Sequence, residues 1–361
     1  MEQNNRDVSL LQLLRRPAFC VENGVITRLN EEAAAYLLEV GTEVRQLIRI
    51  GIEDYECFTS GCLYLTLQLG NQTLAACVVT DEQAHIFILE QQEDLAQLRS
   101  FALAARELRE PLAGMMAAAD QLLPTAAAGD DPQAKRHAAQ MNRRLFQMLR
   151  LVGNMSDAAQ YAFGGPERME TVNIAAFLDE LFQRAAELSE KAGISLRYTG
   201  LPQDIFTLAD LDRLERAIYN LLSNAMKACS DCGVIDVKIT RRRDVIIVSI
   251  TDNGRGIQSD MLGNVHSRFL RSPSLMDGQS GLGLGMVLVK STAALHGGVV
   301  LIDRPAGQGT RVSMSIAVRK EKNAIVRSPV LRVDYAGERD HGLLELADVL
   351  PAELYGTDQI N

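Results

Sequence analysis

Four short polar segments follow one another in the second half of the chain, and no other feature constrains the fold as strongly. They read Asn-Leu-Leu-Ser-Asn-Ala-Met-Lys, Asp-Asn-Gly-Arg-Gly-Ile, Gly-Leu-Gly-Leu-Gly and Gly-Gln-Gly-Thr, at residues 220–227, 252–257, 281–285 and 307–310. A single glycine-rich run usually marks only a turn. Four in series, at compatible spacings, predict a pocket for a nucleotide.

The first segment predicts the phosphate and metal end of that pocket. Asn220, Asn224 and Lys227 stand at positions i, i+4 and i+7, so they share one face of a helix. Mg²⁺ prefers oxygen ligands and keeps several waters, so one amide oxygen together with phosphate oxygens suits it. Taken alone, this segment would be read as a polar helix face on the surface.

The other segments predict the base-binding and loop parts of the pocket. Asp252 ends an apolar strand, where its carboxylate can accept a hydrogen bond from the exocyclic amine of adenine. Gly254 and Gly256 let the backbone approach the ring closely. A glycine-rich loop then runs into an apolar helix, whose first N–H groups and dipole favour a phosphate. Its residues are Gly281, Leu282, Gly283, Leu284 and Gly285, preceded by a predicted mobile lid at 275–280 and followed by a tight turn at Thr310.

These segments resemble the N, G1, G2 and G3 boxes of the ATP-binding domain of sensor histidine kinases. That domain belongs to the GHKL superfamily of DNA gyrase, a heat-shock chaperone family and the MutL proteins, and the resemblance spans residues 205–318 and, more weakly, 95–165. It implies an α/β sandwich of the Bergerat type that binds ATP. It also implies that Asn224 binds Mg²⁺, that Lys227 meets phosphate and that Asp252 meets adenine. Arg268 matches the family's Arg-Phe pair before the lid, although the preceding Phe is His266 here.

The resemblance fails at the residue that carries the family's chemistry. Sensor kinases have a phosphoacceptor His within a His-Glu-Leu-Arg-x-Pro-Leu pattern, and Arg106 stands in its place. A guanidinium is always protonated and is not a usable phosphoryl acceptor at neutral pH. Glu107 matches the family's transfer base, but without a histidine we expect a structural role for it. Pro111 and Leu112 fix this register.

Three outcomes stay open for a chain with Arg106. It could bind ATP and signal through conformation alone, phosphorylate another residue such as His137, or hydrolyse ATP without transfer. We expect a cytosolic, sensor histidine kinase-like protein of two-component signal transduction that binds ATP and Mg²⁺. The first alternative is a non-catalytic, ATP-gated pseudokinase scaffold that pairs with another kinase. The second is an anti-sigma-type Ser/Thr kinase, which a long helical hairpin disfavours.

The chain length and the hydrophobic patterns predict an α+β multidomain protein. The N-terminal part is predicted to contain two strands, a helix at 31–38 with Asn30 as its N-cap, and further strands. This order of elements resembles a PAS sensor domain. Two apolar-striped helices at 92–124 and 133–162 predict a hairpin whose wide stripe suits a dimeric four-helix bundle. The predicted domains are residues 1–91, PAS-like; 92–166, dimerisation hairpin; 167–318, ATP-binding α/β sandwich; and 319–361, a tail with a short helix at 342–355.

Bulk properties narrow the classes of partner. A net charge of −9 argues against nucleic-acid binding through charge, and Arg241–Arg243 is interpreted as a solvated hairpin turn. No apolar run approaches the roughly 18–20 residues of a membrane span, and no signal peptide is recognisable, so we expect a cytoplasmic protein. Its six cysteines should then be reduced, and the pair Cys229 and Cys232 is interpreted as a loop feature. A homodimer through residues 92–162 is expected, with a response regulator or a partner kinase as further partner.

Overall fold

The computed structural model describes most of the chain, including every predicted domain. The described residues are 11, 14, 16–36, 38–81, 84–90, 92–127, 131–163, 168–229, 233–256, 284–305, 307–319 and 340–356.

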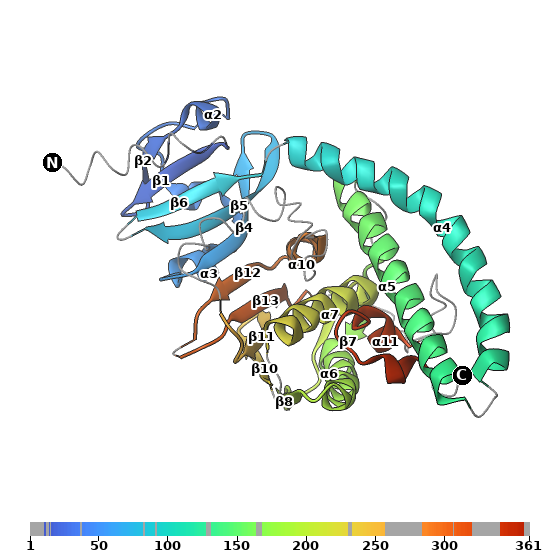
Figure 1. The fold of residues 1–361 in the computed structure, drawn as a ribbon. Coiled ribbons are helices and arrows are strands. Elements are labelled where there is room, and N and C mark those ends of the chain that lie inside the picture. Colours follow the sequence, from blue (N-terminus) through green and yellow to red (C-terminus); the bar gives the residue numbers. More distant parts are fainter. Residues whose placement is uncertain are drawn as a thin grey trace.

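The N-terminal part is an antiparallel sheet with short helices at its edge (Figure 1). Asn30 caps the first helix as expected, because its Oδ1 accepts the Ala33 N–H at 3.0 Å. That helix is shorter than the predicted 31–38, and one strand and one helix near residue 50 were not expected. The elements are β1 (Ala18–Glu22), β2 (Val25–Leu29), α2 (Glu31–Ala34), η1 (Val44–Gln46), β3 (Ile48–Ile50), α3 (Ile52–Glu56), β4 (Cys62–Leu69), β5 (Gln72–Asp81) and β6 (Ala84–Leu89).

A long helical hairpin follows, formed by α4 (Gln92–Ala127) and α5 (Pro132–Phe163). The expectation that Pro124 ends the first helix is wrong, since α4 continues to Ala127 with Pro111 and Pro124 inside it. A proline removes one backbone hydrogen bond. The packing of α4 on α5, which buries Leu123, offsets that loss. None of the helices in the described part of the chain combines the length and hydropathy that a membrane span requires.

Only half of the apolar stripe predicted on α4 is buried within the chain; the stripe consists of Leu98, Phe101, Ala105, Leu108, Leu112, Met115, Ala119 and Leu122. Leu112 and Ala119 are each 2% exposed, and they pack toward α5. Met115 and Leu122 belong to the same predicted stripe, yet they are 45% and 67% exposed. The stripe is therefore wider than one partner helix covers.

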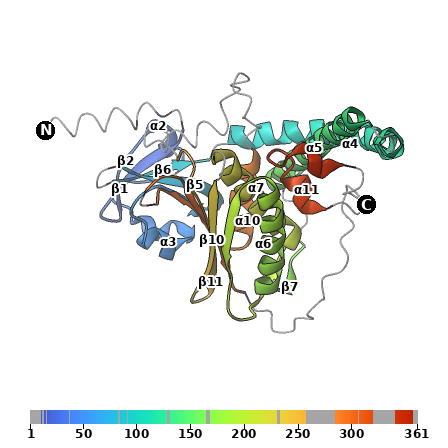
Figure 2. The same ribbon diagram turned by 60° about the horizontal axis from the view of Figure 1, so that its bottom comes forward.

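The second half of the chain forms a layer of helices on a sheet, which confirms the predicted α/β fold of the ATP-binding part. Helices α6, α7 and α10 pack on one face of the strands (Figure 2). The short strands β7 and β9 were not expected, and they pair with each other outside the main sheet. The elements are β7 (Glu170–Asn173), α6 (Ile174–Lys191), β8 (Ser195–Thr199), β9 (Phe206–Ala209), α7 (Leu211–Ala228), β10 (Val234–Arg242), β11 (Val245–Asp252), α10 (Leu284–Leu295), β12 (Val300–Asp303) and β13 (Arg311–Ala317).

One continuous sheet joins the two halves of the chain. Its strand order is β2-β1-β6-β5-β4-β12-β13-β11-β10-β8, and β4 of the N-terminal part pairs antiparallel with β12. Gly61 allows this contact, because it has a φ of +100° and a Cβ there would overlap the carbonyl oxygen of Ile302. Across the same seam, Lys290 of α10 pairs with Glu90 at 2.9 Å and lies over the ring of Tyr64.

The last described segment, Asp340–Gly356, contains α11 (His341–Glu345) and the 3₁₀-helix η2 (Ala352–Tyr355). It packs on α5, α6 and α7 (Figures 1 and 2). A short helix was expected in this region, but its docking on the rest of the protein was not.

Candidate functional site

Helix α7 carries the first motif and presents its polar residues at different depths. Asp210 caps the helix, with its side chain accepting the Arg213 N–H at 3.2 Å. Asn220 is buried, and its Nδ2 donates to the Arg216 carbonyl at 2.8 Å. Asn224 is exposed and Lys227 is partly exposed, one and two turns further along the helix. Of the three predicted residues, Asn224 and Lys227 are therefore accessible to solvent, whereas Asn220 is packed inside the protein.

Asp252 lies at the end of β11 and organises the turn that follows. Its Oδ1 accepts the N–H groups of Gly254 at 2.9 Å and Thr310 at 3.2 Å. Burial raises the pKa of this carboxyl, although the backbone hydrogen bonds pull the pKa the other way. Among the residues that the structure describes, Oδ2 accepts no hydrogen bond, so it keeps its capacity to accept one from a base.

Glycines bring three of the four motifs into contact. A Cβ on Gly254 would overlap the carbonyl oxygen of Ala228, at the end of α7. A Cβ on Gly309 would overlap the carbonyl oxygen of Asp252, and its φ of +102° already disfavours other residues. Gly256, with a φ of +69°, lies against the backbone of Gly309. The second motif therefore touches the fourth, and also the residue that directly follows the first, through close backbone contacts that a side chain would block.

The third motif meets the first at the start of α10. A Cβ on Gly285 would lie 2.7 Å from Oδ1 of Asn220, so the small residue allows α10 to pack closely on α7. Leu284, the first residue of α10, is buried. The remaining predicted residues of this region fall outside the described part of the chain: Arg268, Gly281, Leu282, Gly283 and the expected lid at 275–280.

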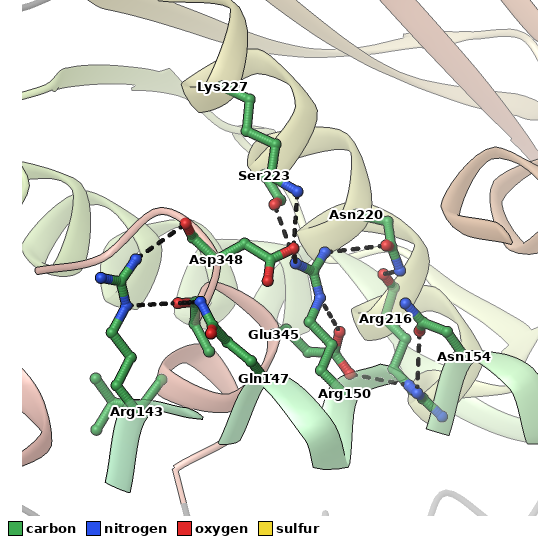
Figure 3. A network of polar contacts seen from close by, with 12 residues as sticks. Arg143, Gln147, Arg150, Asn154, Arg216, Asn220, Ser223, Lys227, Glu345 and Asp348 are labelled. Atoms are coloured by element: carbon green, nitrogen blue, oxygen red, sulfur yellow. Dashed lines mark hydrogen bonds and ion pairs between the residues drawn. The ribbon is translucent and has the colours of Figure 1, made fainter. Parts of the chain in front are cut away.

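Arg150 of α5 reaches into this site, and sequence reasoning did not find it. Its Nη2 donates to Asn220 Oδ1 at 3.1 Å and its Nη1 to Ser223 Oγ at 3.2 Å (Figure 3). The side chain is only 6% exposed. The predicted apolar stripe of the second helix gave no signal for this residue, because Arg150 lies about 200° around the helix from Met148 and therefore on the face opposite the stripe.

Two carboxylates of the C-terminal segment form ion pairs with Arg150 and with basic residues of α7. Nη1 of Arg150 lies 2.7 Å from Oδ2 of Asp348, and Nζ of Lys227 lies 2.7 Å from the same oxygen. Nε of Arg150 forms an ion pair with Glu345 at 3.4 Å that lacks hydrogen-bond geometry. Arg216 of α7 binds the other oxygen of Glu345 at 3.0 Å. The first motif therefore faces both the hairpin and the C-terminal segment (Figure 3).

The residue at the expected phosphoacceptor position lies on the surface of the hairpin. Arg106 and Glu107 are exposed on α4, and His137 is exposed on the second turn of α5. Arg109, three residues after Arg106, donates to Ser156 Oγ of α5 at 3.1 Å.

The other predicted features outside the motifs have plain structural roles where they are described. Arg241–Arg243 is exposed, as expected, but only Arg243 lies in the turn, because Arg241 and Arg242 are the last residues of β10 and pair with β11. Cys229 is partly buried, whereas Cys232 lies outside the described residues.

The residues present fit a magnesium nucleotide. Asn224 is exposed and carries an amide oxygen, Lys227 carries an ammonium group, and Asp252 carries a carboxylate beside glycine-containing turns. Within the described ranges, no group of three or more His, Cys, Asp or Glu residues gathers to hold a metal. A cation here would therefore depend on Asn224 and on the oxygens of the nucleotide itself.

Comparison with known proteins points in the same direction. Residues 209–320 match the family model described as histidine kinase-, DNA gyrase B-, and HSP90-like ATPase. The sensor-like histidine kinase SenX3 of Mycolicibacterium smegmatis is 31% identical over 253 residues, which cover 66% of this chain and 64% of SenX3. The alginate biosynthesis sensor protein KinB of Pseudomonas aeruginosa is 27% identical over 292 residues, which cover 79% of this chain and 47% of KinB.

These curated relatives are longer than the matched part. The chain spans less than two thirds of the length of both. Among solved structures, histidine kinase ThkA in complex with response regulator protein TrrA matches 87% of this chain and 99% of its own at 16% identity. Its TM-score is 0.42.

Proposed function

Because this chain belongs to the sensor histidine kinase family, we propose that it binds ATP with Mg²⁺ beside α7 and acts in two-component signal transduction. The observation that carries the proposal is the meeting of the four motifs. Gly254 packs on the end of α7, Gly309 on Asp252, and Gly285 on Asn220. Residues spread over ninety positions of sequence are thus held around one place.

Each residue has a role that follows from its chemistry. Asn224 would hold Mg²⁺ through its amide oxygen, and Lys227 would pair with a phosphate. Asp252 would accept a hydrogen bond from the adenine amine, with Thr310 N–H fixing the orientation of its carboxylate. When bound, Mg²⁺ would neutralise phosphate charge. The family resemblance assigns Arg268 and the loop Gly281, Leu282, Gly283, Leu284 and Gly285 to the phosphates.

We infer that this chain does not phosphorylate its own residue 106. Arg106 has no lone pair to offer, because its guanidinium stays protonated at any physiological pH. An ATP-gated pseudokinase scaffold that pairs with a competent kinase is therefore the second candidate, and the observation that favours it is this replacement. Transfer to His137, ATP hydrolysis alone and an anti-sigma-type Ser/Thr kinase are the remaining alternatives.

The domain assignment belongs to the same proposal. Residues 1–91 act as a PAS-like sensor, 92–166 as the dimerisation hairpin and 167–318 as the ATP-binding domain, with a tail at 319–361. The exposed half of the stripe on α4 supports a homodimer through residues 92–162. A response regulator or a partner kinase would receive the signal. Cytoplasmic action fits, because ATP and reduced thiols belong to that compartment.

The binding claim is tested by titrating the purified chain with Mg-ATP in a calorimeter, beside Asn224→Ala. We expect saturable binding by the wild type that weakens at least tenfold in the variant. Equal binding by both proteins would show that the assigned metal position is wrong. The same proteins with gamma-labelled ATP then separate the alternatives: label on the protein would indicate transfer, which His137→Ala localises, and free phosphate would indicate hydrolysis.

A further inference from the structure

The C-terminal segment Asp340–Gly356 docks as firmly as a core element, although the proposed function gives it no role. Leu346 and Leu350 are fully buried, as is Tyr355. The ring of Tyr355 packs edge-on against Phe146 of α5, and its hydroxyl donates to the Leu343 carbonyl at 2.7 Å. The segment therefore has one defined position on α5 and α7.

Side chains of α5 hold the backbone of this segment at Asp348. Nε of Arg143 and Nε2 of Gln147 both donate to the carbonyl of Ala347 at 3.0 Å. Nη2 of Arg143 donates to the carbonyl of Asp348 at 3.1 Å. Fixing both carbonyls fixes the direction of the Asp348 side chain, which points at Lys227 (Figure 3).

Asp348 places a negative charge at the cation assigned to phosphate. Its Oδ2 contacts Lys227 Nζ and Arg150 Nη1, each at 2.7 Å. Burial alone would raise the pKa of this carboxyl, but Arg150 and Lys227 hold the pKa below its ordinary value. The carboxylate is therefore ionised at neutral pH, and a triphosphate approaching Lys227 would meet a like charge.

We propose that the segment Asp340–Gly356 is an internal latch in which Asp348 competes with nucleotide phosphate for Lys227. The latch rests on the proposed function, because it assumes that Lys227 meets phosphate. Docking of the segment and binding of the nucleotide then oppose each other, and by linkage each weakens the other by the same factor.

The shared arginine extends this competition to the hairpin. Arg150 belongs to α5 and contacts Asn220 and Ser223 of α7 as well as Asp348. While the segment is docked, its carboxylates and this arginine hold the ATP-binding part against the hairpin. Loss of Asp348 from the cluster removes a charge partner of Arg150, so nucleotide binding loosens the contact between α5 and α7. Binding of ATP would thus change the conformation of the hairpin without any phosphoryl transfer.

The test compares Asp348→Asn with Glu353→Gln in calorimetric titrations with Mg-ATP. Glu353 is an exposed carboxylate of the same segment, so its replacement is a matched loss of charge away from Lys227. Loss of one exposed or half-buried ion pair that competes with the nucleotide should change the affinity for Mg-ATP about threefold. We expect Asp348→Asn to bind Mg-ATP about threefold more tightly than the wild type, and Glu353→Gln to match the wild type.

Hydrogen exchange gives a second readout that does not depend on activity. Mg-ATP at a concentration that just saturates the wild type should speed amide exchange in its peptides covering residues 342–355, and it should have a smaller effect on Asn224→Ala, whose weaker site is only partly filled at that concentration. Equal affinity of the wild type and Asp348→Asn, or exchange unaffected by bound nucleotide, would overturn the latch alone. Absence of binding by both would overturn the proposed function and the latch with it.

Discussion

At the scale of single residues, His296 shows how burial fixes a protonation state. It is 1% exposed, and its Nε2 accepts the N–H of Asp210, the cap of α7, at 3.0 Å. Nδ1 must then carry the proton, which it donates to the Thr292 carbonyl at 2.7 Å. Burial lowers the pKa of His296, and the nearby Arg319 and Arg213 lower it further, while the Thr292 carbonyl and Asp210 act in the opposite sense.

This lowered pKa predicts a loss of stability in mild acid. The folded state binds fewer protons than the unfolded chain, so stability is fully present above about pH 6.5 and falls as the pH drops toward the folded pKa. Urea unfolding of the wild type and His296→Gln at pH 7.5 and 5.5 measures this. Glutamine keeps an acceptor for the Asp210 N–H but does not titrate, so we expect a smaller loss in the variant. Identical losses in both proteins would contradict the assignment.

At the scale of elements, one buried arginine ties three of them together. Arg150 joins α5 to α7 through Asn220 and Ser223, and to the C-terminal segment through Glu345 and Asp348. Glu345 is 2% exposed and also binds Arg216 of α7. Removing one member of such a cluster leaves the opposite charge buried without its partner.

We therefore expect Arg150→Ala to lower the free energy of unfolding by about 3–5 kcal/mol. Arg144→Ala is the matched control, since Arg144 is exposed on the same helix and contacts only Gln147 among the described side chains. Denaturant titrations followed by circular dichroism give both values. A change below about 1 kcal/mol for Arg150→Ala would mean that apolar packing alone holds the three elements.

At the scale of the whole molecule, the described chain leaves a large apolar surface on the hairpin. Leu103 and Leu122 of α4 are 68% and 67% exposed, and Met141 of α5 is 51% exposed. Two helices cannot cover so wide a stripe, whereas four helices can. At the other end of the molecule, the pairing of β4 with β12 joins the predicted sensor to the ATP-binding sheet.

Replacing Leu122 with lysine should weaken the proposed dimer at least tenfold, because it places a charge in an interface that excludes water. Val40→Lys is the control, since Val40 is equally apolar and 62% exposed but lies in the N-terminal part. Size-exclusion chromatography with light scattering, over a dilution series, reports the masses. A wild type that is monomeric throughout would contradict the dimer proposal directly.

Much of the fold could be read from local pattern. The apolar run of β11, the alternation in β13 and the amphipathic face of α7 predict the correct elements, because burial leaves a pattern along the chain. The short strands β7 and β9 were missed, since four residues carry too little periodicity to be distinguished from a loop. Pro124 was read as a helix end because its missing N–H is local, whereas the packing that offsets it is not.

The sequence by itself determined the chemistry of the side chains: which residues carry an amide, an amine or a carboxylate, where glycine is required, and that Arg106 stands where the family resemblance implies a phosphoacceptor. Those properties belong to side chains and to neighbours a few positions apart. Only the tertiary structure decided that Arg150 would reach Asn220, that Asp348 would contact Lys227, and that β4 would pair with β12. These partners lie tens to hundreds of residues apart. Such contacts form only once burial of the apolar core has brought distant segments together, which no local pattern records.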